Sequence, residues 1–323
     1  MLRKLGLLTL AALGAAAAPA QAQTPTVIQY GVVARVAIQW QEIIATEMGL
    51  FAKYGVKPEV SNVGASPKVV QGLAGGTFNI GESGMPEVVR ASEQGAPVKI
   101  IAAEMAAAPY RWNVGKNITK VEDLKGKKIM LGGQKDITVV YLEAIAKKHN
   151  LKMTDFDFLY AGSTSNRFAA LVGGAIDCTL LAQPFDLQAE RQGFKSVATQ
   201  KDYTPDAPFT AYAANMDWAA KNKNAVAGFV RATMDAAAWL YDLKNRDAAI
   251  KTLVNVGAKP EDAQATYDLY TGSLKPFRTD GVMTDAAITY MLKALVAWDE
   301  MKEPLPPTSK YYDDTYVKLA RSM

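Results

Sequence analysis

Cysteine and histidine are almost absent from this chain of 323 residues, which contains one of each, Cys178 and His149. A single cysteine excludes an internal disulfide bond, and the two residues together cannot supply the ligands of a zinc site. A serine–histidine–aspartate triad would depend on His149, which we expect at a helix end. Cys178 lies in the apolar segment 175–181, which reads as a buried strand. We therefore expect no metal, no cofactor and no enzymatic activity.

The chain also lacks a large excess of charge of one sign. Its 36 lysine and arginine residues against 32 aspartate and glutamate residues give a net charge of +4, and Arg3 and Lys4 contribute to that excess. Proteins that bind nucleic acids cluster basic residues on one face and carry a larger excess. The charge balance therefore excludes nucleic acid as the expected partner, and the composition is that of a globular protein.

No apolar run reaches the roughly 20 residues that a transmembrane helix needs. The run at 5–18 is shorter, follows Arg3 and Lys4, and leads to Ala20-Gln21-Ala22, the small-residue pattern that a signal peptidase accepts. No cysteine follows this run for lipid attachment. We predict a signal peptide over residues 1–22 and export of a free protein to the periplasm.

An internal repeat is the most informative feature of the sequence. The segment 73–80, LAGGTFNI, is echoed by 171–178, LVGGAIDC, and the same ungapped frame aligns Pro86 with Pro184. Each copy reads as a helix, a glycine stop, a strand, and a helix with proline in its first turn. The repeat therefore predicts two similar lobes.

Strands and helices alternate along both lobes. Strands are expected at 26–33, 56–63, 128–131 and 156–160, and helices at 38–48, 137–149 and 164–172. This alternation predicts an α/β fold whose parallel sheets carry helices on both faces. After a strand at 209–215 the apolar spacing predicts only helices, at 224–243, 247–256, 261–271 and 284–302.

Four sequence motifs occur in a characteristic order: EMGLFAKYGV at 47–56, GLAGG at 72–76, GAPVK at 95–99 and DLKGKKI at 123–129. In this order and spacing they resemble the ABC-transporter substrate-binding family of nitrate, taurine, alkanesulfonate and thiamine-pyrimidine transport. The resemblance covers almost the whole mature chain. It implies a two-lobe periplasmic-binding-protein fold of type II, with two crossings and mostly parallel sheets flanked by helices. The lobes would be 23–110 with 206–323, and 111–205. The implied partners are a small-molecule ligand and an ABC permease in the inner membrane, and one copy of the chain would suffice.

Ligands of parallel sheets bind beyond the carboxyl ends of the strands, where loops lead into helix N-termini. Here those loops are 33–39, 64–66, 81–84, 132–138, 161–167 and 182–185. Their serine and threonine residues can cap helices or bind acid oxygens, Arg35, Lys135 and Arg167 can supply positive charge, and aromatic residues can form stacking walls. The candidate ligand-binding residues are Arg35, Gln39, Trp40, Ser66, Glu82, Ser83, Tyr110, Lys135, Thr138, Gln183, Phe185 and Tyr212.

These residues favour a small organic anion, a carboxylate or a sulfonate, with or without an aromatic ring, as the solute. Glu82 leaves an alternative open, because it could accept hydrogen bonds from an amino-bearing solute such as a thiamine-precursor pyrimidine, or pair with Arg35. Trp40 could equally pack in the core. A sensor subunit that uses the same closure of two lobes is a further alternative.

Overall fold

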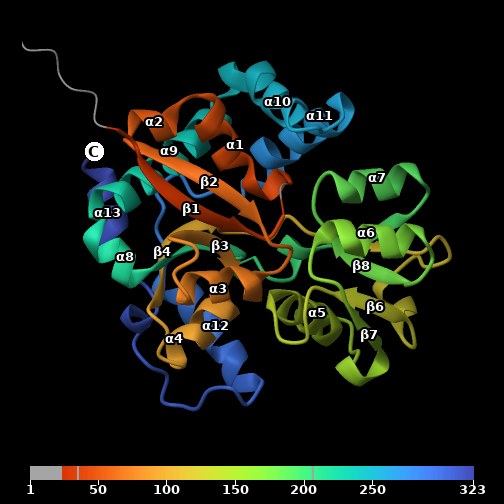
Figure 1. Ribbon diagram of the computed structural model, residues 1–323. Coiled ribbons are helices and arrows are strands. Elements are labelled where there is room, and N and C mark those ends of the chain that lie inside the picture. Colours follow the sequence, from red (N-terminus) through yellow and green to blue (C-terminus); the bar gives the residue numbers. More distant parts are fainter. Residues whose placement is uncertain (1–23, 35, 206) are drawn as a thin grey trace, which may run out of the picture.

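The structure is a computed structural model in which residues 24–34, 36–205 and 207–323 are described. The expected signal peptide and Arg35 therefore lie outside the described residues. Two five-stranded sheets, each flanked by helices, form the cores of two lobes (Figure 1). Among the described residues, no helix combines the length and the apolar character that crossing a bilayer requires.

The sheet of the first lobe has the strand order β2-β1-β3-β10-β4. Its strands are β1 (Thr26–Val32), β2 (Val56–Asn62), β3 (Ile80–Gly84), β4 (Val98–Met105) and β10 (Thr210–Asn215). Strand β1 pairs in parallel with β2 and β3, whereas β10 runs antiparallel between β3 and β4. The carboxyl ends of the four parallel strands therefore lie at one edge of this sheet.

The sheet of the second lobe repeats this arrangement in the order β7-β6-β8-β5-β9. Its strands are β5 (Arg111–Val114), β6 (Lys128–Leu131), β7 (Asp157–Tyr160), β8 (Cys178–Leu181) and β9 (Lys195–Thr199). Here β5 is the antiparallel strand, and like β10 it follows directly after the chain has crossed from the other sheet. The two similar lobes that the repeat predicts are confirmed, and Cys178 is buried in a strand as expected.

The helices of the repeat follow the expected pattern. In the first lobe these are α1 (Trp40–Glu47), α2 (Leu50–Lys53), α3 (Ser66–Ala74) and α4 (Met85–Glu93), and in the second α5 (Ile137–Lys148), α6 (Thr164–Val172) and α7 (Phe185–Arg191). Gly76 after α3 and Gly174 after α6 have φ angles of 75° and 71°, a left-handed conformation that glycine adopts without steric cost. The paired glycines of the repeat therefore end equivalent helices.

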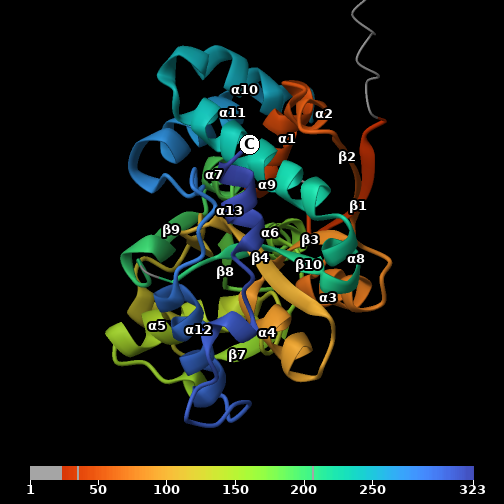
Figure 2. The same ribbon diagram turned by 90° about the vertical axis from the view of Figure 1, so that its left-hand side faces the viewer.

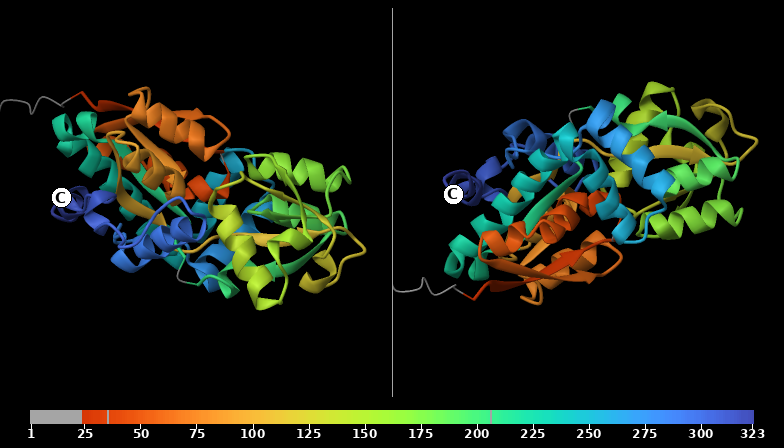
Figure 3. Two further views of the ribbon diagram at one scale, coloured as in Figure 1. Left: turned by 90° about the horizontal axis from the view of Figure 1, so that it is seen from below. Right: turned by 90° about the horizontal axis from the view of Figure 1, so that it is seen from above.

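The C-terminal helices pack on the first lobe (Figure 2). They are α8 (Met216–Lys221), α9 (Lys223–Tyr241), α10 (Arg246–Asn255), α11 (Pro260–Leu269), α12 (Asp285–Ala297) and α13 (Thr315–Arg321). Helix α9 contacts α1 and α13, and α12 contacts α4. Both views in Figure 3 show the second lobe, coloured yellow to green, at the other end of an elongated molecule.

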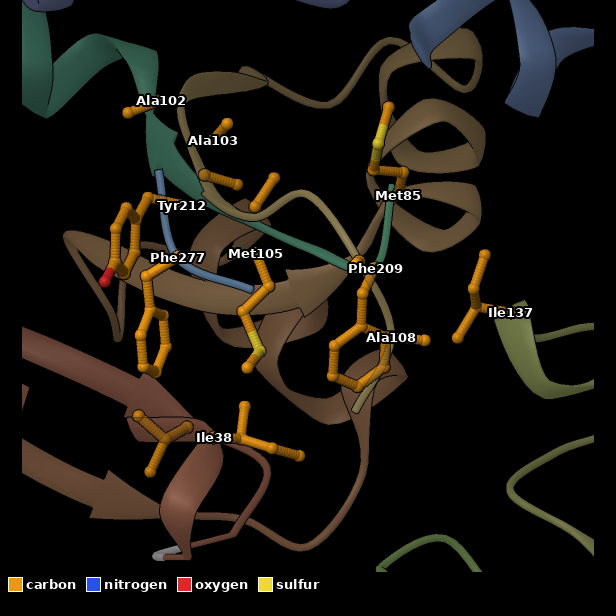
Figure 4. Packing of buried hydrophobic residues seen from close by; sticks show 14 of the residues in the cluster. Ile38, Met85, Ala102, Ala103, Met105, Ala108, Ile137, Phe209, Tyr212 and Phe277 are labelled. Carbon is orange, nitrogen blue, oxygen red and sulfur yellow. The ribbon is translucent and has the colours of Figure 1, made fainter. Parts of the chain in front are cut away.

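The core beside the crossings contains residues that are far apart in the sequence. Figure 4 shows Met105, Phe209 and Phe277 from the first lobe and its connections, with Ile137 at the start of α5. All four are buried. The first crossing comprises residues 106–110, because β4 ends at Met105 and β5 begins at Arg111. The two lobes thus share apolar contacts where the chain passes between them.

Helix α12 ends earlier than expected. The sequence pattern predicts a helix to residue 302, but the helix stops at Ala297, and Asp299 has a φ angle of 57°. Aspartate is one of the few residues besides glycine that visit this left-handed region. The residues after Ala297 therefore leave the helix axis instead of extending α12 by another turn.

Candidate functional site

A cavity of about 200 Å³ lies between the two lobes. It is lined by residues of the strand-end loops 33–39, 64–66 and 81–84 of the first lobe and 132–138 and 161–167 of the second, together with Pro67, Tyr110, Phe209 and Thr210. The sixth strand-end loop, 182–185, contributes no described residue to the lining. The cavity is closed on one side by close approach of two loops, because a Cβ atom built on Gly162 would lie 2.7 Å from the carbonyl oxygen of Gly64.

Five of the candidate residues line this cavity: Gln39, Ser66, Glu82, Tyr110 and Thr138. The Oγ of Ser66 accepts a hydrogen bond from the Gly84 amide at 3.3 Å, so this side chain also joins α3 to the end of β3. The Oγ1 of Thr138 likewise accepts from the Gly132 amide at 2.9 Å. The structure thus brings polar groups of both lobes to one cavity.

Three other candidate residues are buried and form hydrogen bonds outside the cavity. Ser83 donates to the Gly84 carbonyl oxygen at 3.1 Å. Gln183 donates from Nε2 to Asp186 Oδ2 at 2.7 Å and to the Pro109 carbonyl oxygen at 3.3 Å. Tyr212 donates to Glu42 Oε1 at 3.0 Å. These hydrogen bonds occupy side chains of β3, of β10 and of the loop before α7, and none of the three side chains lines the cavity.

Trp40, Phe185 and Lys135 also lie outside the cavity lining. Trp40 is fully buried, donates from Nε1 to Thr252 Oγ1 at 2.8 Å and packs against Tyr270, so it belongs to the core. Phe185 packs against Phe168 with ring centroids 5.2 Å apart. Lys135 is exposed at the surface. Arg35 is outside the described residues, so its predicted role stays a prediction.

Arg167 is the one lysine or arginine among the described residues that lines the cavity. It lies in the first turn of α6, and only 1 % of its surface is exposed. Its Nε donates to the Leu180 carbonyl oxygen at 3.1 Å, one Nη donates to the Gly162 carbonyl oxygen, and the guanidinium lies 5.6 Å from the ring centroid of Tyr110. Arg167 is one of the three cations that the sequence predicts, and unlike Lys135 it lines the cavity.

Three helices, α3, α5 and α6, begin at the cavity wall. The first amide groups of a helix have no partner within it and carry a partial positive charge. At α6 the Ser163 hydroxyl accepts from the Asn166 amide at 3.4 Å. At α5 the Asp136 carboxylate accepts from the Thr138 amide at 2.9 Å. The amides of α5 are therefore partly satisfied by an acidic side chain. In α3, Pro67 has no amide N–H and the Lys68 amide donates to the Ala65 carbonyl oxygen at 3.1 Å, so fewer first-turn amides are available there than in α6.

Glu82 is the acidic residue of the first lobe that lines the cavity. Its Oε2 accepts from Gln39 Nε2 at 3.0 Å and from the Val33 amide at 3.3 Å. Burial, together with the nearby charge of Glu42, raises the pKa of Glu82 to about 7. Near neutral pH this carboxyl group is therefore divided between a neutral form, which can donate a hydrogen bond, and an ionised form, which can only accept.

Further carboxyl groups lie behind the wall of the first lobe. Glu42 accepts hydrogen bonds from Tyr30 at 2.6 Å and from Tyr212, and burial raises the pKa of Glu42. Burial and the charges of Glu42 and Glu82 raise the pKa of Glu104 well above its usual range. This cluster explains why Glu82 resists ionisation, because each additional negative charge in a poorly solvated region costs free energy.

The two residues that the sequence offers as possible reactive groups, Cys178 and His149, both lie outside the cavity lining. Burial raises the pKa of the Cys178 thiol far above its usual range, which leaves it without nucleophilic thiolate. His149 lies on the outside of the second lobe, where its ring nitrogens contact Glu122 at 2.7 Å and Tyr203 at 2.8 Å. Within the described residues, no group of histidine, cysteine and acidic side chains could hold a metal ion. What the geometry can do is hold an acid group between Arg167 and helix amides.

Known proteins resemble this chain over most of its length. The bicarbonate transport ATP-binding protein CmpC of Synechocystis is 27% identical over 236 residues, which are 66% of this chain and 35% of that protein. The chain thus spans about a third of that relative.

Two solved structures share the fold. The periplasmic nitrate-binding protein NrtA from Synechocystis PCC 6803 has a TM-score of 0.75 at 17% identity, covering 93% of this chain and 89% of that one. The periplasmic aliphatic sulphonate binding protein SsuA from Escherichia coli has a TM-score of 0.70 at 19% identity, covering 90% and 99%.

The sequence profile of the family described as NMT1/THI5 like matches residues 40–245. This match includes most of the first lobe's repeat, all of the second sheet, β10 and α9. It also contains Glu82, Arg167 and the helices that begin at the cavity. Since the match extends over more than half of the sequence and the fold agrees, the chain belongs to the NMT1/THI5 like family.

Proposed function

We propose that this protein is the solute-binding component of an ABC importer, and that it captures a small organic anion, a carboxylate or a sulfonate with or without an aromatic ring, between its two lobes. The observation that carries the proposal is the position of Arg167. The Arg167 guanidinium is almost fully buried, lines the cavity and donates hydrogen bonds to neutral carbonyl oxygens, so it can attract an anion. The Asp136 carboxyl group of the same cavity interacts electrostatically with Arg167, and burial raises the pKa of that carboxyl group, which favours its neutral form.

The helix N-termini support the same class of solute. The first turns of α3, from the first lobe, and α6, from the second, both open on the cavity. An acid oxygen placed at the first turn of α6 would receive amide hydrogen bonds in addition to the charge of Arg167. Phe209 and Tyr110 at the same wall would suit an apolar or aromatic part of the solute.

Glu82 is compatible with an anion because its pKa of about 7 allows a neutral carboxyl group at neutral pH. In that form it would donate a hydrogen bond to the solute instead of repelling it. An amino-bearing pyrimidine, the alternative that Glu82 left open, has less support. The related proteins described above are named for bicarbonate transport, nitrate and aliphatic sulphonate, which are small anions.

Binding would be coupled to a hinge movement. We assign residues 23–110 and 206–323 to one moving lobe and 111–205 to the other, with the crossings at 106–110 and 200–209 as hinges. A solute that contacts both lobes binds the closed form better than the open form and shifts the population towards it. The closed form would then be recognised by a permease in the inner membrane. This role places a monomeric, non-catalytic protein in the periplasm, and the predicted signal peptide supports that location.

A ligand screen tests the proposal. The mature chain from residue 23 is melted in the presence of alkanesulfonates, nitrate, aliphatic and aromatic carboxylates, and pyrimidines. A solute at about 100 times its dissociation constant adds about 2.7 kcal/mol to the free energy of unfolding, so the melting temperature rises. We expect a dose-dependent rise with one class of organic acid. A rise with pyrimidines alone would overturn the anion assignment.

A further inference from the structure

A turn that follows α12 reaches from the first lobe to the second. Residues 298–300, which we call the Trp298 turn, begin where α12 ends and contact α5 and the loop before it. Figures 1 and 2 both show α5 near α12. They are separate from both crossings of the chain, so they join the lobes independently of the covalent connections.

Glu300 joins cations from both lobes. Its Oε1 lies 2.6 Å from Lys135 Nζ of the second lobe, and its Oε2 lies 2.6 Å from Arg90 Nε on α4 of the first lobe. Only 16 % of the Glu300 side chain is exposed. Burial alone would raise the pKa of Glu300, but the hydrogen bonds from Lys135 and Arg90 outweigh it and hold this pKa below its usual range. The carboxylate is therefore ionised at the point where the lobes meet.

Trp298 contacts the second lobe through both its polar and its apolar parts. Its Nε1 donates to Glu143 Oε1 of α5 at 2.9 Å. Its ring borders a hollow of about 300 Å³ whose other described lining residues, among them Val139 and Phe158, all come from the second lobe. On the first lobe, the Arg90 guanidinium lies 5.6 Å from the centre of the indole ring. The indole thus lies between a cation of one lobe and a hollow of the other.

We propose that the Trp298 turn is a latch that forms when the lobes close and that stabilises the closed form by itself. This inference rests on the hinge movement of the proposed function. Neither Trp298, Glu300, Lys135 nor Glu143 lines the cavity, so the latch acts whatever solute the cavity accepts. It also gives Lys135 a role different from the anion contact expected of it, because the Lys135 ammonium is engaged by Glu300.

The latch is suited to modulate an equilibrium rather than to hold the fold together. Lys135 has 59 % of its side chain exposed, and exposed ion pairs contribute little to stability. Removing either contact across the lobes leaves the core of each lobe intact. We therefore expect variants of the latch to fold normally and to change the ratio of closed to open molecules, and with it the affinity for the solute.

The test measures the distance between the lobes without any solute. Spin labels are attached to cysteines introduced at the exposed positions Lys57 and Lys152, while the buried Cys178 stays unlabelled. Pulsed electron resonance then gives the distance distribution for the parent chain, for Lys135→Met, for Trp298→Phe and for both together. Lys135→Met leaves the Arg90–Glu300 pair of the first lobe in place.

We expect each substitution to lower the ratio of closed to open molecules about fivefold, and the two together to lower it further. Asp314→Asn is the matched control, because it removes the Lys318–Asp314 ion pair within α13 and should leave the distribution unchanged. The proposal is overturned if the parent chain shows no closed population, or if both latch variants show the distribution of the parent. Because no solute is used, failure here is distinct from failure of the anion assignment.

Discussion

Arg167 and Glu82 line the same cavity, but their surroundings act differently on the charge of each side chain. The carbonyl oxygens of Leu180 and Gly162 accept hydrogen bonds from the Arg167 guanidinium. Glu82 accepts hydrogen bonds from two amide groups, but its burial and the nearby charge of Glu42 raise its pKa, so its charge is poorly stabilised. The cavity therefore combines one guanidinium with two carboxyl groups, those of Glu82 and Asp136, and burial raises the pKa of both.

The raised pKa of Glu82 predicts how stability depends on pH. In the unfolded chain this group titrates near 4.5, and in the folded chain near 7, so the folded state binds more protons between these values. The contribution of Glu82 to folding stability is therefore fully present below pH 4.5 and is lost as pH rises through 7. We expect Glu82→Gln to reduce the decline in the free energy of unfolding between pH 5.5 and 8, by up to about 1 kcal/mol per pH unit.

Urea unfolding at several pH values measures this effect, with Glu303→Gln at an exposed position as the control. Part of the decline should persist in Glu82→Gln, since burial also raises the pKa of Glu87, to about 8. If Glu82→Gln and the control show the same pH dependence as the parent chain, Glu82 is ionised in the folded protein and cannot donate to an anion.

Trp40 gives a second prediction at this scale. Its indole Nε1 donates to Thr252 Oγ1, and its ring packs against Tyr267 and Tyr270, so we expect Trp40→Phe to lower the free energy of unfolding by about 1–2 kcal/mol through the lost hydrogen bond. Affinity for the solute should stay within about twofold, because the residue is in the core. Calorimetric melting and a binding titration check both parts, with Trp239→Phe on α9 for comparison. A large loss of affinity would instead return Trp40 to the site.

At the scale of elements, the sequence predicts which loops meet but not which side chains face the cavity. Five of the six strand-end loops contribute to the lining, because parallel strands place their carboxyl ends at one edge. The loop 182–185 does not contribute, since Gln183 is bonded to Pro109 and Asp186 and Phe185 packs on Phe168. These are tertiary contacts, and no local pattern in the sequence specifies them.

The sequence also could not predict which of the two cations, Arg167 or Lys135, lines the cavity. Both follow strands of the second lobe, and their residue types are equally suited to an anion. Arg167 lies in the first turn of α6 and is turned inward, whereas Lys135 reaches Glu300, which the shorter α12 makes accessible. The early end of α12 was not predicted, because its apolar spacing continues past Ala297 and only the left-handed Asp299 ends it.

The approach of the loops at Gly64 and Gly162 yields a prediction for closure. A methyl group on Gly162 would lie 2.7 Å from the Gly64 carbonyl oxygen, a backbone atom that cannot easily move. We expect Gly162→Ala to hinder closure and to weaken solute binding about tenfold or more, measured by titration calorimetry. Gly174→Ala is the control, because Gly174 also has a positive φ angle but nothing within 4 Å. Equal affinities for both variants would mean that these loops do not meet in the bound form.

At the scale of the whole molecule, the repeat in the sequence is the origin of the two-lobe fold. Each lobe builds four parallel strands and receives one antiparallel strand, β10 or β5, just after a crossing. Because β10 and β5 each follow a crossing, the cavity lies beside both crossings. A small rotation at the crossings would therefore change the distance between Arg167 and Glu82. The sequence reveals the repeat, and the family resemblance implies two crossings, while the closeness of the lobes follows from packing that only the structure shows.

The central claim is that Arg167 holds the acid group of a solute between the lobes. We test this role of Arg167 by titration calorimetry with the acid found in the screen. The proteins compared are the parent chain, Arg167→Lys and the exposed control Arg321→Lys. Lysine keeps the charge but loses the planar fork, so we predict binding at least about tenfold weaker for Arg167→Lys, measured at a temperature where every variant is folded, and parent-like affinity for the control. Parent-like affinity in Arg167→Lys would contradict the claim and place the acid group elsewhere.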